Sequence, residues 1–101
     1  MGNYFKAIKK QDLVEGGGVQ VSIEGKSIAV FKIDENIYAI DNLCPHRGGP
    51  LAEGDLKGSC VSCPWHAWEF DVTTGCNPEN SEIKVNKYNV KIEGEDLFIE
   101  I

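Results

Sequence analysis

Two short motifs, each with one cysteine and one histidine, constrain the fold of this chain more than any other feature of its sequence. The first, at residues 44–46, reads Cys-Pro-His, and the second, at residues 63–66, reads Cys-Pro-Trp-His. They contain both histidines of the chain and two of its four cysteines. Together they offer two thiolate and two imidazole ligands, a donor set that transition metals prefer. The fold must therefore bring two separate loops to one metal centre.

Two kinds of metal centre accept this donor set. A structural zinc site takes two cysteines and two histidines, but it usually pairs Cys with Cys and His with His at short spacing. A [2Fe–2S] cluster in which two histidines replace two cysteines on one iron takes one ligand of each kind from both loops. The mixed spacing, Cys-x-His and then Cys-x-x-His, favours the cluster, and zinc remains the alternative.

With these motifs, the chain resembles a soluble Rieske-type ferredoxin, the ferredoxin component of aromatic-ring dioxygenase systems, from about Tyr4 to the C-terminus. The resemblance implies one Rieske [2Fe–2S] cluster per chain. It also implies that Cys44 and Cys63 bind one iron, and that His46 and His66 bind the other.

Several residues around these four ligands suit such a site. A proline after each cysteine fixes φ and removes an N–H where the chain turns. Glycines let backbone N–H groups approach sulfur, and such hydrogen bonds tune the potential of a cluster. For Trp68, a cover over the cluster and a plain core position are equally compatible. By the resemblance, a later loop bearing Pro78 covers the cluster. The residues expected around the ligands are Pro45, Arg47, Gly48, Gly49, Pro64, Trp65, Trp68 and Pro78.

Short apolar or alternating runs separated by turn residues dominate the rest of the chain. They predict strands at 4–8, 19–23, 27–33, 37–40, 59–62, 67–72, 83–92 and 97–101, with a helical turn at 11–13 and a bulge or break near Asn86. This pattern predicts an all-β, antiparallel sandwich or barrel. The resemblance adds a small cluster-binding subdomain of two ligand hairpins. We expect one Rieske domain, 1–101, with residues 1–42 and 81–101 as its base and 43–80 as that subdomain.

The net charge of −6 is concentrated in one part of the sequence. Residues 41–82 hold seven acidic residues against Arg47 and Lys57, a net charge of −5. This balance argues against nucleic acid and anionic membranes as partners. It is compatible with a solvated surface, or with steering toward a basic patch on a protein partner.

Cys60 and Cys76 lie outside the two motifs. In high-potential Rieske proteins an extra cysteine pair bridges the ligand loops, but this chain has Gly49 and Trp65 at those positions, so that bridge is absent. A Cys60–Cys76 disulfide is conceivable, although a reducing cytosol favours free thiols. The sequence shows neither a membrane-spanning run nor a signal-peptide core, so we expect a soluble, cytoplasmic protein.

Three functions are compatible with a Rieske chain. The first, an oxygenase with its own mononuclear iron, needs two further histidines and a carboxylate. The chain has no other histidine, so this function is excluded. The small subunit of assimilatory nitrite reductase resembles a Rieske domain but often lacks the ligands, so it stays as the alternative. We expect a one-electron carrier with no catalytic residues, placed between a flavin-containing NAD(P)H reductase and a terminal oxygenase.

The residues after the second motif predict a low potential. In high-potential members of the family, a serine and a tyrosine donate hydrogen bonds to cluster sulfurs at the positions that Trp68 and Phe70 occupy here. Neither side chain has a hydroxyl, and Glu69 and Asp71 add negative charge. We expect a potential near the low end of the Rieske range, which runs from roughly −150 to +300 mV.

Overall fold

The computed structural model describes residues 3–44, 48–64 and 68–101. Within these residues the chain is nearly all β, as expected, with ten strands and two short 3-10 helices. In chain order the elements are β1 (Tyr4–Lys9), η1 (Lys10–Asp12), β2 (Gly18–Ile23), β3 (Lys26–Ile33), β4 (Asn36–Asp41), η2 (Leu51–Glu53), β5 (Asp55–Lys57), β6 (Cys60–Ser62), β7 (Glu69–Asp71), β8 (Lys87–Tyr88), β9 (Val90–Glu93) and β10 (Asp96–Glu100).

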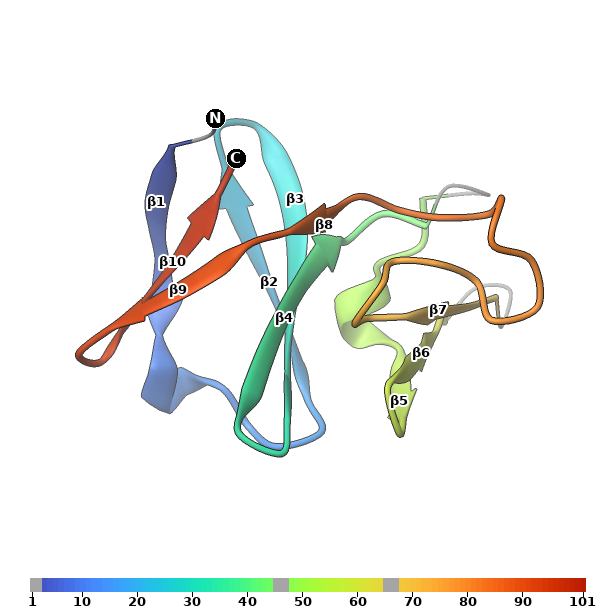
Figure 1. Ribbon diagram of the computed structural model, residues 1–101, viewed down its shortest axis with the longest axis horizontal. Helices are drawn as coiled ribbons and strands as arrows, with labels where there is room; N and C mark the ends of the chain where they lie inside the picture. The colour runs from blue at the N-terminus through green and yellow to red at the C-terminus, as the bar shows by residue number, and fades with distance from the viewer. Residues whose placement is uncertain (1–2, 45–47, 65–67) are drawn as a thin grey trace.

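Two antiparallel sheets form the base of the molecule (Figure 1). One has the strand order β2-β3-β4-β8 and the other β1-β10-β9. Their apolar faces share one core, which is the usual way for two half-buried sheets to remove apolar area from water. The buried residues of this core are Leu13, Ile23, Ile28, Val30, Ala39, Leu97 and Ile99.

A third antiparallel sheet, β5-β6-β7, lies beside the base (Figure 1). It packs with η2 on a second core, to which Val61 of β6 and Phe70 of β7 contribute from directly opposite positions. The buried residues of this second core are Ala29, Phe31, Ile40, Cys44, Leu51, Ala52, Val61, Cys63, Phe70 and Val72.

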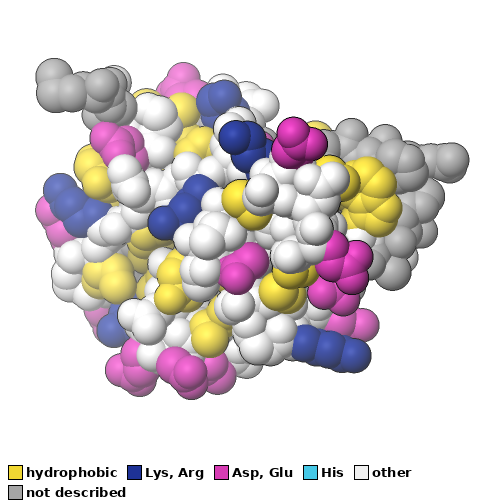
Figure 2. Space-filling model, turned by 45° about the vertical axis from the view of Figure 1, so that its right-hand side comes forward, with side chains coloured by type: hydrophobic (Ala, Val, Ile, Leu, Met, Phe, Trp, Pro, Cys, Tyr) yellow, Lys and Arg dark blue, Asp and Glu magenta, His cyan; other side chains and the backbone are white. Residues whose placement is uncertain are grey.

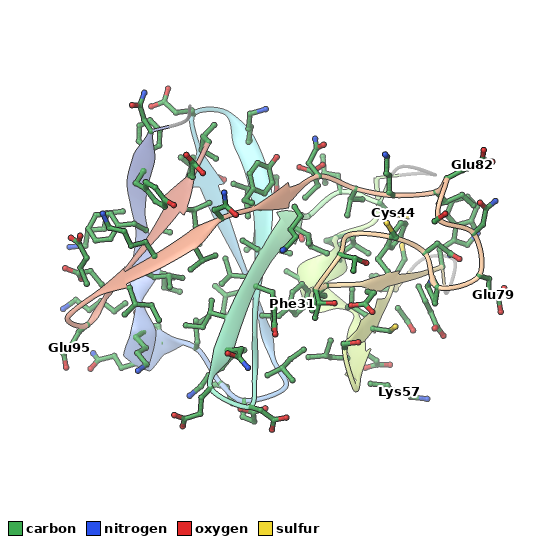
Figure 3. The ribbon with its side chains drawn as sticks, viewed as in Figure 1. Phe31, Cys44, Lys57, Glu79, Glu82 and Glu95 are labelled. Carbon is green, nitrogen blue, oxygen red and sulfur yellow. The ribbon has the colours of Figure 1, made fainter. Side chains whose placement is uncertain are left out.

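Strand β3 belongs to both cores. Its four central residues, 28–31, are fully buried. Because side chains alternate along a strand, Ile28 and Val30 face the core of the base while Ala29 and Phe31 face the second core. Figure 3 shows Phe31 between the base and the third sheet. This strand therefore fixes the third sheet, and the two motif cysteines packed with it, against the base.

The strand prediction for residues 83–92 is wrong in its first part. Residues 83–86 lie outside the strands, β8 begins only at Lys87, and Asn89 separates β8 from β9. The reason is that this segment pairs with an irregular loop instead of a strand. Val85 N–H donates to the carbonyl of Gly75 at 2.8 Å, and Cys76 and Lys84 form an isolated antiparallel bridge.

Strand β5 is a second difference, because it is not among the predicted strands. It forms because Leu56 lies opposite the buried Val61 and packs against the second core. None of the helices in the described part of the chain has the length and apolar composition needed to cross a membrane.

Candidate metal centre

The first motif begins at the tip of a hairpin. Leu43 and Pro50 form an antiparallel bridge, and Cys44 follows directly. The N–H of Cys44 donates to the carbonyl of Gly49 at 2.9 Å, and the N–H of Gly48 donates back to the carbonyl of Cys44 at 2.6 Å. Gly48 has φ +74°, a left-handed conformation that residues with a Cβ seldom adopt. These two hydrogen bonds close the loop at Cys44.

The second motif begins in the same way. Ser62 of β6 pairs with Glu69 of β7, and Cys63 follows directly. The N–H of Cys63 donates to the carbonyl of Trp68 at 2.7 Å. In both hairpins, therefore, the cysteine N–H reaches a carbonyl five residues further along. The expectation that the two motifs lie at the tips of two hairpins is confirmed for the residues that the structure describes.

Both motif cysteines are buried in the second core. Cys44 and Cys63 are each 2% exposed, and neither forms a disulfide. A metal compensates the charge of a thiolate that ligates it, which makes a buried thiolate favourable in such apolar surroundings. The two cysteines fit a metal centre by their burial and by the matched construction of their loops. Figure 3 shows Cys44 at the end of the molecule away from the base.

The other expected ligands, His46 and His66, lie outside the described residues, as do Pro45, Arg47 and Trp65. Among the residues that the structure does describe, no group of three or more potential metal ligands occurs. The geometry therefore concerns only Cys44 and Cys63 of the four expected ligands. That His46 and His66 are ligands stays a prediction from the sequence.

A buried asparagine anchors the first ligand hairpin. Asn42 is 1% exposed, and its side chain donates to Ser27 Oγ at 3.1 Å and accepts from the N–H of Ala52 at 2.8 Å. Its backbone also bonds to Ser27 and to Leu51. The hairpin is therefore tied to β3 and to η2 at once. Sequence reasoning missed this residue, and the only available signal was an asparagine directly before a ligand loop.

The neighbouring aspartate joins the same hairpin to the returning chain. One carboxylate oxygen of Asp41 accepts from the Tyr88 hydroxyl at 2.5 Å, and the other accepts from the N–H of Asn86 at 2.9 Å. Burial, together with the hydrogen bond to the Asp41 carboxylate and its charge, raises the pKa of Tyr88 to about 12. Asp41 and Asn42 together stabilise the connection between the base and the metal-binding end.

The loop of residues 76–83 borders the second ligand hairpin. Asn77 shapes it, because its side-chain oxygen accepts from the N–H groups of Glu79 and Asn80 at 2.8 and 3.0 Å. A pocket of about 300 Å³ lies between this loop and Trp68, which is half-buried and packs against the second core. Pro78, expected to cover the cluster, lines the pocket.

Cys60 and Cys76 are both free thiols. Cys60 lies on β6 opposite Asp71, and its pKa is raised by burial and then by the charges of Asp71 and Glu69. Cys76 lies in the loop that follows β7, where its Sγ is 3.9 Å from the carbonyl of Thr74. The two free thiols agree with the expectation from the sequence.

A family comparison identifies this arrangement. The sequence model of the Rieske [2Fe-2S] domain family matches residues 3–99 of this chain. The chain belongs to the Rieske family. Among its relatives is the ferredoxin component of the naphthalene 1,2-dioxygenase system of Pseudomonas aeruginosa, which is 38% identical over 97% of this chain and 95% of its own. A second relative, from Ralstonia sp., serves naphthalene 1,2-dioxygenase and salicylate 5-hydroxylase systems and is 38% identical over 98% of this chain and 96% of its own.

Solved structures share this fold. The ferredoxin of carbazole 1,9a-dioxygenase from Nocardioides aromaticivorans has a TM-score of 0.88 and 26% identity, over 96% of both chains. A nitrite reductase small subunit from Mycobacterium tuberculosis, at 19% identity and a TM-score of 0.91, over 100% of this chain and 96% of its own, shows the shared fold alone.

The family settles the choice of cofactor. This Rieske protein carries one [2Fe–2S] cluster, and zinc is set aside. With relatives that are ferredoxin components, it is a one-electron carrier and not itself a catalytic enzyme.

Proposed function

We propose that this Rieske protein takes electrons singly from a flavin-containing NAD(P)H reductase and passes them to the terminal oxygenase of an aromatic-ring dioxygenase system, in the cytoplasm. The observation that carries the proposal is the likeness to ferredoxin components of dioxygenase systems, at 38% identity over nearly the full length of both chains. A solved complex of reduced oxygenase and oxidised ferredoxin from carbazole 1,9a-dioxygenase supports it, with a TM-score of 0.85 and 25% identity over 96% of this chain and 92% of that one.

In this proposal Cys44 and Cys63 bind one iron, and His46 and His66 bind the other. The bound cluster supplies a reversible one-electron couple. The chain contributes two buried thiolates on matched hairpins, and residues 43–80 act as the cluster-binding subdomain. Pro45, Arg47, Gly48, Gly49, Pro64, Trp65, Trp68 and Pro78 surround the ligands.

The surface of the cluster-binding end suits a basic partner. Figure 3 shows Glu79 and Glu82 at the end that carries Cys44. Figure 2, which brings this end toward the viewer, shows acidic side chains bordering an apolar patch. We propose that a basic patch on the partner docks here, because complementary charge raises the rate of encounter.

The test compares two electron acceptors in separate reactions. The reduced protein is mixed in a stopped-flow instrument with a terminal oxygenase encoded near its gene, and separately with a sirohaem nitrite reductase of the same organism. We expect rapid reoxidation of the cluster, followed by its absorbance, with the oxygenase alone. Reoxidation by the nitrite reductase alone would refute the proposed function.

A further inference from the structure

A pocket lies on the cluster-binding end, and none of the described residues that line it is a proposed cluster ligand. It is lined by Trp68, Glu69, Asn77, Pro78, Glu79, Asn80 and Ile83 and has a volume of about 300 Å³. Ligand sites for cofactors and small molecules run from about 300 to 1,000 Å³, so this pocket is at the lower limit. Its size suits a single side chain of another protein.

Hydrogen bonds within the 76–83 loop make the pocket preformed. Asn77 N–H donates to the carbonyl of Ile83 at 2.8 Å, and Ile83 N–H donates to the carbonyl of Asn80 at 3.0 Å. The side-chain oxygen of Asn80 also accepts from the N–H of Glu82 at 3.0 Å. These bonds close the loop on itself, so little ordering would be required on binding.

The walls combine an aromatic ring with two carboxylates. Trp68 is half-buried, whereas Glu69 and Glu79 are exposed. Neither carboxylate forms an ion pair within the described ranges, where the ion pairs are Lys6–Asp96 and Lys91–Glu93. An indole face attracts cations, and unpaired carboxylates accept charged donors. Pro78 and Ile83 supply apolar area for the stem of a long side chain.

We propose that this pocket receives an arginine side chain of the terminal oxygenase, and this inference rests on the proposed function. Arginine fits better than lysine because its guanidinium is planar, stacks on aromatic faces and donates to two carboxylates from one rigid fork. The pocket wall includes Trp68 and Glu69, which directly follow the second ligand loop. An arginine bound there would fix the oxygenase beside the cluster.

The first experiment titrates the oxidised, cluster-loaded protein with N-acetyl-arginine amide and follows its ¹H–¹⁵N spectrum. N-acetyl-citrulline amide, the uncharged isostere, is the matched control. We expect saturable shifts of the amides of Glu79 and Asn80 with the arginine compound, and at least fivefold smaller shifts in the variant with Glu69→Gln and Glu79→Gln. Equal responses to arginine and citrulline, or shifts spread over the whole acidic surface, would overturn the proposal.

The second experiment measures binding to the terminal oxygenase by calorimetry at fixed ionic strength. The control variant carries Glu93→Gln and Glu95→Gln, which remove an equal number of negative charges at the turn between β9 and β10. Figure 3 shows Glu95 at the opposite end of the molecule. We expect the pocket variant to bind about five- to tenfold more weakly and the control variant less than twofold, since the charges removed in the control lie away from the pocket. The absorbance of the cluster confirms that each variant is loaded.

The outcomes separate the pocket from the proposed function. Equal losses in the two variants would show general charge attraction and overturn the pocket assignment. A loss confined to binding of the reductase would overturn the assignment to the oxygenase. If the wild-type protein did not bind the oxygenase at all, the proposed function would fail, and the arginine titration would show independently whether the pocket recognises a guanidinium group.

Discussion

Cys44 and Cys63 differ from the other two cysteines in their surroundings. Both are almost fully buried beside apolar side chains, and each N–H is engaged in closing its own hairpin. Cys60 and Cys76 are half-exposed and lie outside the hairpin tips. Many buried cysteines are inert structural residues, so burial alone does not select a ligand. The selection comes from burial together with the paired loops.

The first prediction tests the four proposed ligands. The wild-type protein should contain about two irons and two acid-labile sulfides per chain. Replacing His46 or His66 by alanine should abolish the EPR signal of the reduced cluster, because one iron loses a ligand. Cys60→Ser is the control and should leave the iron content and the signal unchanged. A normal signal in the histidine variants would refute the ligand assignment.

The second prediction concerns the potential of the cluster. Phe70 is fully buried in the core that contains both motif cysteines, and Trp68 packs against that core. We expect a wild-type potential near the low end of the Rieske range. Trp68→Ser and Phe70→Tyr should each raise it, because a hydroxyl that donates to sulfur stabilises the reduced state. A hydrogen bond to a charged group contributes about 1.5–3 kcal/mol, or roughly 65–130 mV for one electron, before screening by solvent.

Protein-film voltammetry measures this shift directly. The Phe70→Leu variant is the control, since it removes the ring without adding a hydroxyl and should not raise the potential. A wild-type potential above about +100 mV would contradict the prediction, because it lies high in the range from −150 to +300 mV.

At the scale of elements, the turn after β7 depends on a glycine. Gly75 has φ +84°, and a Cβ on this residue would lie 2.6 Å from the carbonyl oxygen of Val85. Gly94, in the turn between β9 and β10, has φ +63° and open space around the same position. The two glycines share the left-handed conformation, but only Gly75 is also in close contact with another segment of backbone.

The third prediction uses this matched pair. Gly94→Ala should lower the free energy of unfolding by about 1 kcal/mol, the cost of a left-handed conformation. Gly75→Ala should lower it by about 2 kcal/mol more, because the backbone at Val85 must also shift. Denaturant unfolding of the two variants measures the difference. Equal losses would show that the contact with Val85 is relieved at no cost.

The link between β4 and β8 gives a fourth prediction, which concerns pH. The pKa of Tyr88 is raised to about 12 from an ordinary value near 10. The folded state therefore holds this proton more tightly than the unfolded state. The stabilisation is fully present below pH 10 and is lost as the pH rises toward 12.

Thermal unfolding between pH 9 and 12 tests it. The wild-type protein should lose stability over this range, and Tyr88→Phe should lose less, because its contribution cannot titrate. Tyr4→Phe is the control, since Tyr4 is exposed on β1, and it should follow the wild-type curve. Parallel curves for wild-type and Tyr88→Phe would contradict the prediction.

At the scale of the whole molecule, charge is distributed unevenly. Residues 41–82 carry −5 of the net charge of −6, and they include the whole third sheet. The first forty residues hold five acidic and five basic residues and are neutral overall. Residues 41–82 are therefore acidic, while the rest of the chain carries a net charge of only −1. Such an asymmetry orients a charged partner during encounter.

The fifth prediction follows from this asymmetry. The rate of reduction by the cognate reductase should fall several-fold between low and high salt, because the Debye length shrinks to about 10 Å at 0.1 M ionic strength. Stopped-flow reduction over a salt series measures it. Glu53→Gln with Asp55→Asn, which removes two charges near β5, should weaken the dependence. A rate indifferent to salt would mean that the acidic surface serves only solvation.

Local pattern was sufficient for most strands and for the sites of the two hairpins. Alternating apolar residues predicted β2, because the period of two is a property of the strand itself, and short apolar runs bounded by turn residues predicted β3 and β10. The prediction was wrong for residues 83–86, whose alternation is strand-like. Ile83 and Val85 bond to the preceding loop, at Asn80 and Gly75, and Asn86 bonds to Asp41, 45 residues earlier. Alternation of apolar residues does not reveal these irregular or distant partners.

The sequence by itself determined the donor chemistry of this Rieske protein. Thiolates and imidazoles at that spacing fit a cluster wherever the fold places them, since ligand preference is a property of side chains. Only the tertiary structure decided the roles of Asn42 and of the pocket beside Trp68. A buried amide shared by β3, η2 and a ligand hairpin, and an open pocket between a loop and the start of a strand, exist only once distant segments pack together. Their physical basis is the satisfaction of buried polar groups and the shape of the packed surface, which depend on the whole fold.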